Sequence, residues 1–382
     1  MINSILDILT KYCPVAPDII DKIEITDILM VGDFGKDLDD EHALVLAAGL
    51  HRSGIINLRG VIANLEPALA RATLAKSTLV ELGLPEIPVG VGTPCFKGGV
   101  NLKHETDAPY CSSRYELELD GELLFGRILR ETWSNKTLTL VLNSGLTDTA
   151  KAIMNMPDLF KEKVASVVIM GGVVANGSEV AKDDAGFILP QIGKFGAANN
   201  NFDEASALFV YRFCQENNIP LTILMREAAY GCQMPFSMYD QLKSTNNPIG
   251  ANLWNRQQPS IKALWQAANA PEGSPIRGKV PNRCDRNWFV KTFCAGKDPE
   301  ISGDDDVWSF VDKFQLYDPM NVIAAIPLLR DRFYDSILVD VRGKTHQVIG
   351  LTAECNGIRD EKNLRSFIIE METAALLAPM YK

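Results

Sequence analysis

The sequence lacks the motifs that mark several classes of protein. None of its eight cysteines forms a C-x-x-C pair, and neither the cysteines nor the four histidines have the spacing of a zinc site. No uncharged apolar run approaches the roughly 18 residues of a transmembrane helix. The amino terminus has no basic segment followed by a long apolar one, as a signal peptide would. We therefore expect a cytoplasmic protein with reduced thiols, with export by a signal-less route left open.

Positive charge is also in short supply. The 38 basic side chains are outnumbered by 48 acidic ones, which gives a formal net charge of -10. Nucleic acids and anionic membranes attract clustered Lys and Arg, so this balance argues against both as partners. The chain has 382 residues, of which 46% are hydrophobic, so it can bury a stable core without disulfides. These properties suit an enzyme that acts on small molecules.

Short apolar runs alternate with helical patterns between Thr26 and Met225. This alternation is typical of an α/β fold with an open, mostly parallel sheet flanked by helices and a Rossmann-like core. Strands are predicted at 27–31, 58–63, 88–91, 137–142, 164–170, 220–224 and 336–341. Helices are predicted at 39–48, 67–82, 122–133, 147–155, 203–216, 238–244, 319–328 and 371–381. In such sheets, ligands bind at the carboxyl ends of the strands.

Residues 246–314 differ in character, because they are rich in Pro, Asn and Trp. We interpret them as short helices and loops within a single domain that spans residues 1–382. This insertion is expected to form a lid or an oligomer contact, and a surface decoration is the alternative.

The most informative segment runs from Val31 to Ala47 (VGDFGKDLDDEHALVLA). An apolar strand leads directly into four aspartates, which are Asp33, Asp37, Asp39 and Asp40. A helical pattern follows them. Like charges in so short a turn repel one another, and carboxylate oxygens suit a hard cation such as calcium or magnesium. The alternative is that Asp39 and Asp40 only cap the helix, with the other carboxylates solvated.

Further motifs follow in order along the chain. They are Ile62-Ala63-Asn64, Asn143-Ser144-Gly145-Leu146-Thr147-Asp148, Met170-Gly171-Gly172, Asn199 with Asp203, and Tyr317-Asp318-Pro319. Together with the acidic segment, this order resembles the inosine-uridine preferring nucleoside hydrolases, over about residues 26–328. That family cleaves the N-glycosidic bond of ribonucleosides with a bound calcium ion. Each motif also has a structural explanation: Asp318 before Pro319 suits a helix start, and Met170 suits a core.

The resemblance implies a role for each matching residue. Asp33, Asp40, Asp318 and the backbone carbonyl of Asn143 would ligate Ca²⁺, and Asp33 would also activate a calcium-bound water as the catalytic base. Substrate would be held by Asp39, Asn64, Met170, Asn199 and Tyr317. The products would be ribose and a free base, which implies a role in purine or pyrimidine nucleoside metabolism, and the chain would form a homodimer or homotetramer. Carboxylates near an oxocarbenium-like sugar stabilise its developing positive charge.

Some positions depart from the family pattern. Ala197 stands where an acidic contact to the 5-hydroxyl is usual, and Tyr317 replaces a histidine that some members carry. A 5-modified ribosyl compound is therefore one expected ligand. Two other functions stay open: a catalytically silent member that binds a ribosyl ligand or a protein, and a magnesium-dependent phosphohydrolase.

Overall fold

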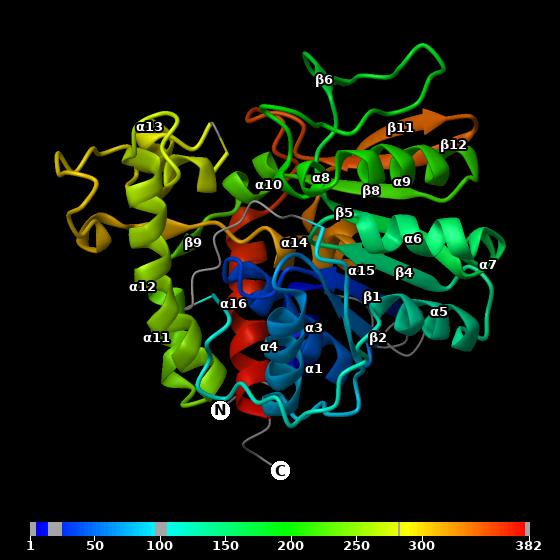
Figure 1. Ribbon diagram of the computed structural model, residues 1–382, viewed down its shortest axis with the longest axis horizontal. Coiled ribbons are helices and arrows are strands. Elements are labelled where there is room, and N and C mark those ends of the chain that lie inside the picture. The colour runs from blue at the N-terminus through cyan, green and yellow to red at the C-terminus, as the bar shows by residue number, and fades with distance from the viewer. Residues whose placement is uncertain (1–4, 14–24, 96–104, 282, 379–382) are drawn as a thin grey trace.

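A computed structural model describes residues 5–13, 25–95, 105–281 and 283–378 (Figure 1). An eight-stranded sheet lies at its centre, in the order β11-β12-β8-β5-β4-β1-β2-β3. Its strands are β1 (Thr26–Gly32), β2 (Ile56–Ala63), β3 (Val89–Val91), β4 (Leu138–Leu142), β5 (Val164–Gly171), β8 (Leu221–Met225), β11 (Ile337–Val341) and β12 (Lys344–Ile349). Every neighbouring pair is parallel except β11 and β12. The predicted α/β class is confirmed.

Helices cover both faces of the sheet. The side chains of β1 alternate between the two resulting cores: Ile28 and Met30 enter one, and Leu29 and Val31 enter the other. The first core is closed by α1 (Ile5–Tyr12), α3 (Asp39–Arg52), α4 (Ala68–Glu81) and α16 (Glu361–Leu377). The second is closed by α5 (Gly121–Glu131), α6 (Thr147–Asn155), α7 (Pro157–Lys163) and α9 (Glu204–Glu216). A strand buried on both faces explains the continuous apolar run of β1.

The strand order changes direction at β1. From β1 the chain builds outward through β2 and β3, and it then returns to add β4, β5 and β8 on the other side. Backbone hydrogen bonds join the strand ends there: Asn143 N–H donates to Val31 O at 2.8 Å, and Asn64 N–H donates to Gly32 O at 3.0 Å. Such a switch point opens a crevice at the carboxyl edge, where ligands bind in open α/β sheets.

The structure corrects several predicted boundaries. The helix predicted at 319–328 is two helices, α14 (Asp318–Ala324) and α15 (Pro327–Phe333), because Pro327 begins a new helix. The final helix, α16, begins ten residues earlier than the predicted 371, where the Asp360 side chain accepts a hydrogen bond from Asn363 N–H. Residues 379–381 of that prediction lie outside the described residues. Strand β12 was not predicted.

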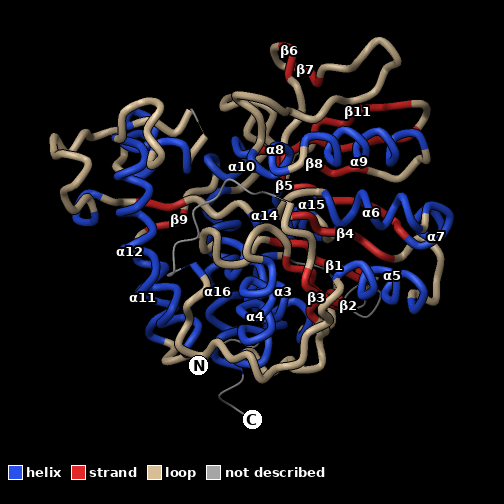
Figure 2. Tube along the Cα trace, in the orientation of Figure 1, coloured by secondary structure: helices blue, strands red, loops and turns tan. Residues whose placement is uncertain are grey.

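The insertion contains one long helix rather than only short ones. Helix α12 (Pro248–Asn269) has 22 residues, and Asn247 caps it by accepting a hydrogen bond from Ile249 N–H. Figure 2 shows α12 and α11 (Ser237–Ser244) standing beside the sheet. Smaller elements complete the described chain: α8 (Ala198–Phe202), α10 (Arg226–Gly231), α13 (Arg286–Phe293), η2 (Arg277–Lys279), η3 (Trp308–Phe310), and the pairs β6 (Ala175–Asn176) with β7 (Glu179–Val180) and β9 (Met234–Pro235) with β10 (Lys313–Phe314).

Within residues 5–378, leaving aside the undescribed segments, no helix is both long and apolar enough to cross a bilayer.

Candidate functional site

An acidic loop, residues 33–38, joins β1 to α3 at the carboxyl edge of the sheet. Two glycines allow its shape. A Cβ atom at Gly32 would lie 2.3 Å from Oδ1 of Asp40, and one at Gly35 would lie 2.0 Å from the backbone oxygen of Glu105. Gly35 also has a φ of +89°, which a side chain would strain. Close packing of the loop against Asp40 and Glu105 therefore requires glycine at both positions.

Three carboxylates converge at the base of this loop, one of them from the loop itself. Asp40 is fully buried, and Asp33 and Asp318 are each 4% exposed. Burial raises the pKa of Asp33 and raises the pKa values of Asp40 and Asp318 well above the ordinary range; repulsion from neighbouring carboxylates adds to each shift. Asp318 begins α14, which packs against α3, so residues far apart in sequence meet at one point.

Two further aspartates extend the cluster. Oδ2 of Asp39 accepts a hydrogen bond from the backbone N–H of Tyr317 at 3.2 Å. Carboxylate oxygens of Asp37, Asp39 and Asp40 all lie within 4.8 Å of one another, with Asp37 exposed. This group is consistent with the calcium site that the resemblance implies. The sequence analysis counted Asp37 and Asp39 in the acidic run but assigned the metal to Asp33, Asp40, Asp318 and the carbonyl of Asn143, so the geometry adds Asp37 and Asp39 as candidate ligands.

The asparagines hold the strand ends in place. Nδ2 of Asn199 donates to the carbonyl oxygens of Asn143 and Met170, both at 2.9 Å. The carbonyl of Asn143 has a second lone pair, which can still meet a cation. Asn64 is fully buried, and its Nδ2 donates to Oδ2 of Asp148 at 2.9 Å. It is absent from the described residues that line the cavity below, so it lies behind the wall, whereas Asn199 is part of that wall.

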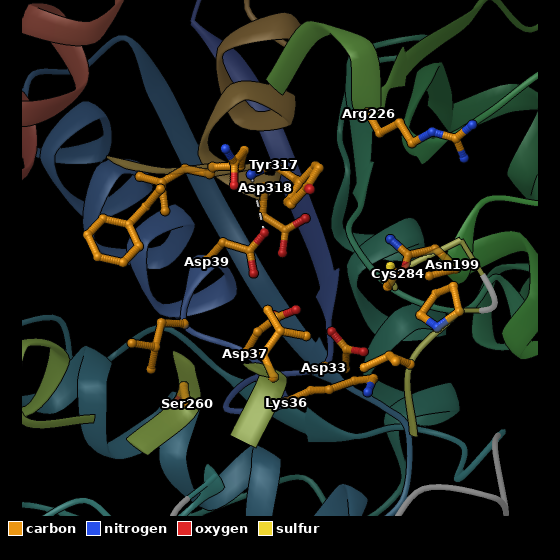
Figure 3. A pocket seen from close by; sticks show the side chains of 18 of the residues that line it. Asp33, Lys36, Asp37, Asp39, Asn199, Arg226, Ser260, Cys284, Tyr317 and Asp318 are labelled. Carbon is orange, nitrogen blue, oxygen red and sulfur yellow. Dashed lines mark hydrogen bonds between the residues drawn. The ribbon is translucent and has the colours of Figure 1, made fainter. Parts of the chain in front are cut away.

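A cavity of about 400 Å³ opens beside the acidic cluster. Of the predicted site residues, those that line it are Asp33, Asp39, Asn143, Met170, Asn199, Tyr317 and Asp318. Asp40 lies beneath them. Figure 3 shows Asp33, Asp37, Asp39 and Asp318 grouped together, with Asn199, Cys284 and Arg226 across from them. Helix α12 contributes Gln257, Ser260, Ile261, Ala263, Leu264 and Ala267, so the insertion forms part of the wall.

The wall across from the carboxylates carries arginines. Nη1 of Arg226, and Nε and Nη1 of Arg283, are buried and find no hydrogen-bond partner in the described part of the chain. Burial raises the pKa of the nearby Cys284 thiol, and the charges of Arg283, Arg277 and Arg226 oppose that rise. Sequence reasoning missed these arginines, because no local motif separates them from surface arginines.

Aromatic side chains close the end of the cavity near Tyr317. The Tyr317 and Tyr230 rings pack edge to face, with centroids 6.3 Å apart. Nε1 of Trp288 donates to the hydroxyl of Tyr230 at 3.2 Å. Burial raises the pKa of Tyr317 well above its usual value, so its hydroxyl stays protonated at neutral pH. An apolar ring and a hydroxyl donor are therefore available to a planar ligand group.

Sequence comparison connects the chain to one curated relative. No protein-family model matches it. An inosine-uridine preferring nucleoside hydrolase from Leishmania major is 31% identical over 170 residues, which are 42% of this chain and 53% of that protein. The chain thus matches this relative over only about half of the relative's length.

Solved structures match almost the whole chain. The type III effector protein XopQ, crystallised with adenosine diphosphate ribose, is 26% identical, with a TM-score of 0.76 over 98% of both chains. The effector protein XOO4466 is 25% identical, with a TM-score of 0.75 over 97% of this chain and 98% of that one. An inosine-uridine preferring nucleoside hydrolase from Bacillus anthracis shares the fold, with a TM-score of 0.55 and 15% identity over 92% of this chain and 100% of that one. The predicted resemblance is confirmed, and the chain is a protein of the inosine-uridine preferring nucleoside hydrolase fold.

Proposed function

We propose that this protein hydrolyses the N-glycosidic bond of a ribonucleoside or related N-riboside and depends on calcium. The observation that carries the proposal is the convergence of three buried aspartates beside a cavity large enough for such a ligand: Asp33 and Asp318 line the cavity, and Asp40 lies beneath them. The arrangement supports charge stabilisation of an oxocarbenium-like sugar, which N-glycosidic cleavage requires.

The residues present fit a bound cation. Both carboxylate oxygens of Asp40 are buried and have no hydrogen-bond partner among the described residues. Several buried carboxylates side by side are costly unless a positive charge compensates them. Asp33, Asp40, Asp318 and the carbonyl of Asn143 would hold calcium, with Asp37 and Asp39 beside them. The ion would supply positive charge that makes a water more acidic and attracts the ribose hydroxyls.

The protein's own residues would then carry the reaction. The water oxygen forms a bond to C1′ of the ribose as the bond between C1′ and the base nitrogen breaks. The electron pair of the broken bond leaves with the base. Asp33 takes the proton that the water loses. Asp39 and Asn199 line the cavity and would orient the ribose hydroxyls. The Tyr317 hydroxyl is a protonated donor that can hydrogen-bond the departing base.

The far wall suits a ligand with an anionic 5′ substituent. Ala197, in the wall, offers no carboxylate to a free 5′-hydroxyl, and Arg226 and Arg283 have buried donors without partners among the described residues. Guanidinium groups bind phosphates well. The effector XopQ was crystallised with ADP-ribose. We therefore propose ribosyl compounds with a 5′-phosphate or 5′-diphosphate as the preferred class. A second candidate function, favoured by the same arginines, is binding of such a ligand without turnover.

A substrate panel tests the proposal. Purified protein is incubated with purine and pyrimidine nucleosides, their 5′-monophosphates and NAD⁺, with calcium or with a chelator, and the released base is measured by chromatography. We expect calcium-dependent release from at least one compound. Calorimetric binding of ADP-ribose with no base released from any compound would instead establish the binding protein.

A further inference from the structure

The acidic loop is held from behind by two buried arginines. Its first three backbone carbonyls, those of Asp33, Phe34 and Gly35, each accept a hydrogen bond from a guanidinium group. These hydrogen bonds fix the direction of the three carbonyls. They therefore also restrict the backbone that carries the loop side chains. The arginines come from helices on different parts of the chain, α4 and α12.

Arg71 of α4 is the first of these. Its Nη1 donates to the carbonyl oxygens of Asp33 and Phe34, both at 3.1 Å. Its Nη2 donates to Oε2 of Glu105 at 3.0 Å. The side chain is 2% exposed, so its charge is held within the protein and compensated by Glu105.

Arg256 of α12 is the second. Its Nη1 donates to Oε2 of Glu41 at 2.6 Å, and its Nη2 donates to the carbonyl of Gly35 at 3.3 Å and also to the carbonyl of Glu105. Glu41 is fully buried and follows Asp40 directly on α3; its other oxygen accepts a hydrogen bond from the Tyr110 hydroxyl at 3.1 Å. One side chain of the insertion thus contacts both the acidic loop, at Gly35, and α3, at Glu41.

This arrangement assigns a role to the insertion that its sequence does not suggest. We propose that Arg256 is a positioning residue that connects α12 to the acidic loop and so sets the affinity of the site for its cation. The inference rests on the calcium site of the proposed function. Residues that orient metal ligands without touching the metal commonly change metal affinity by 10- to 100-fold when they are replaced.

The geometry explains why arginine is needed. A planar guanidinium can donate to Glu41 and to two backbone carbonyls at once, whereas a lysine ammonium on a flexible stem cannot reproduce that fork. Methionine at position 256 would keep the apolar stem but leave Glu41 buried without its cation. Both changes would let the loop move relative to α3, which carries Asp40.

Cation affinity, rather than catalysis, is the measurement that tests the proposal. The full chain is titrated with calcium, and binding is measured by calorimetry. It is also titrated with terbium, whose luminescence lifetime reports the number of waters bound to the ion. The matched control is Arg52→Met, since Arg52 lies at the other end of α3 and donates to the Ala375 carbonyl at 2.9 Å. We expect Arg256→Met to bind calcium at least tenfold more weakly with a shorter terbium lifetime, Arg256→Lys to recover only part of the affinity, and Arg52→Met to stay within twofold of the parent.

Two results would overturn the inference, and they differ from a failure of the proposed function. If Arg256→Met binds calcium within twofold of the parent, or if Arg52→Met weakens binding equally, Arg256 has only a structural role. If the parent itself binds no calcium at millimolar concentration, the calcium site of the proposed function fails first. Should Arg256→Met not fold, as judged by circular dichroism, Glu41→Gln removes the same ion pair with little change in shape and is expected to weaken calcium binding in the same way.

Discussion

The backbone N–H of Tyr317 donates to Oδ2 of Asp39 across 3.2 Å, although 278 positions separate the two residues in sequence. This bond joins the beginning of α14 to the beginning of α3. It therefore holds the Asp318 carboxylate beside Asp40, and it places Tyr317 in the wall of the same cavity.

Replacement of single aspartates distinguishes the buried Asp33, the proposed base, from the exposed Asp37. Asp33→Asn keeps the shape of the buried residue but removes the proposed base, so we expect base release to fall by about 10²- to 10⁴-fold. Asp37→Asn changes an exposed carboxylate and should lower the rate less than tenfold. Initial rates on the best substrate of the panel measure both effects. Equal losses in the two variants would show that the Asp37 carboxylate is as essential as that of Asp33.

Calcium should stabilise the folded protein. At a calcium concentration of 100 times Kd, binding to the native state adds about 2.7 kcal/mol to the free energy of unfolding. Asp40→Asn should abolish this gain. In the presence of a chelator the same variant should be at least as stable as the parent, because it removes one of several buried, mutually repelling carboxylates. Urea unfolding with calcium or chelator measures both quantities, and a calcium gain that survives in the variant would contradict the ligand role of Asp40.

His346 should make the protein less stable in mild acid. Burial lowers the pKa of His346 to about 4, and its Nδ1 accepts a hydrogen bond from Leu221 N–H at 3.0 Å. The unfolded chain takes up a proton below its ordinary histidine pKa near 6.5, whereas the folded chain does not, so stability is lost as the pH falls from 6.5 toward 4. The loss is less than about 3 kcal/mol. His346→Gln should flatten this part of the curve of unfolding free energy against pH; an unchanged slope would assign it to other groups.

The arginine wall should discriminate between ligands. Arg283→Met removes unpartnered donors of the cavity wall, so ADP-ribose should bind about 10-fold more weakly, as expected for a lost hydrogen bond to a charged group. Binding of inosine, which has no phosphate, should change less than twofold and serves as the internal control. Isothermal calorimetry with both ligands provides the comparison. Equal weakening of both ligands would point to a general disturbance of the pocket.

Local patterns predicted much of the fold. Helix α6 has the predicted bounds, Thr147–Asn155. Its apolar residues recur with a helical period, and the face that they form is the buried face of the helix. Strand β12 (KTHQVI) was missed because its first half is polar, and it becomes a strand only by pairing with β8 and β11. Helix α12 was underestimated because Pro259 and many polar residues interrupt its pattern, although partners on α13 such as Phe289 bury its Trp265.

The sequence by itself determined the alternation of strands and helices and the acidic run that follows β1, because both depend on neighbours along the chain. Only the tertiary structure decided which distant groups complete the site. Asp318 reaches Asp40 because α14 packs against α3, and Arg256 reaches Glu41 from 215 positions away because α12 folds back over the loop. Such contacts carry no local signal, since a buried arginine and a surface arginine have the same letter in the sequence and differ only in what the fold brings to them.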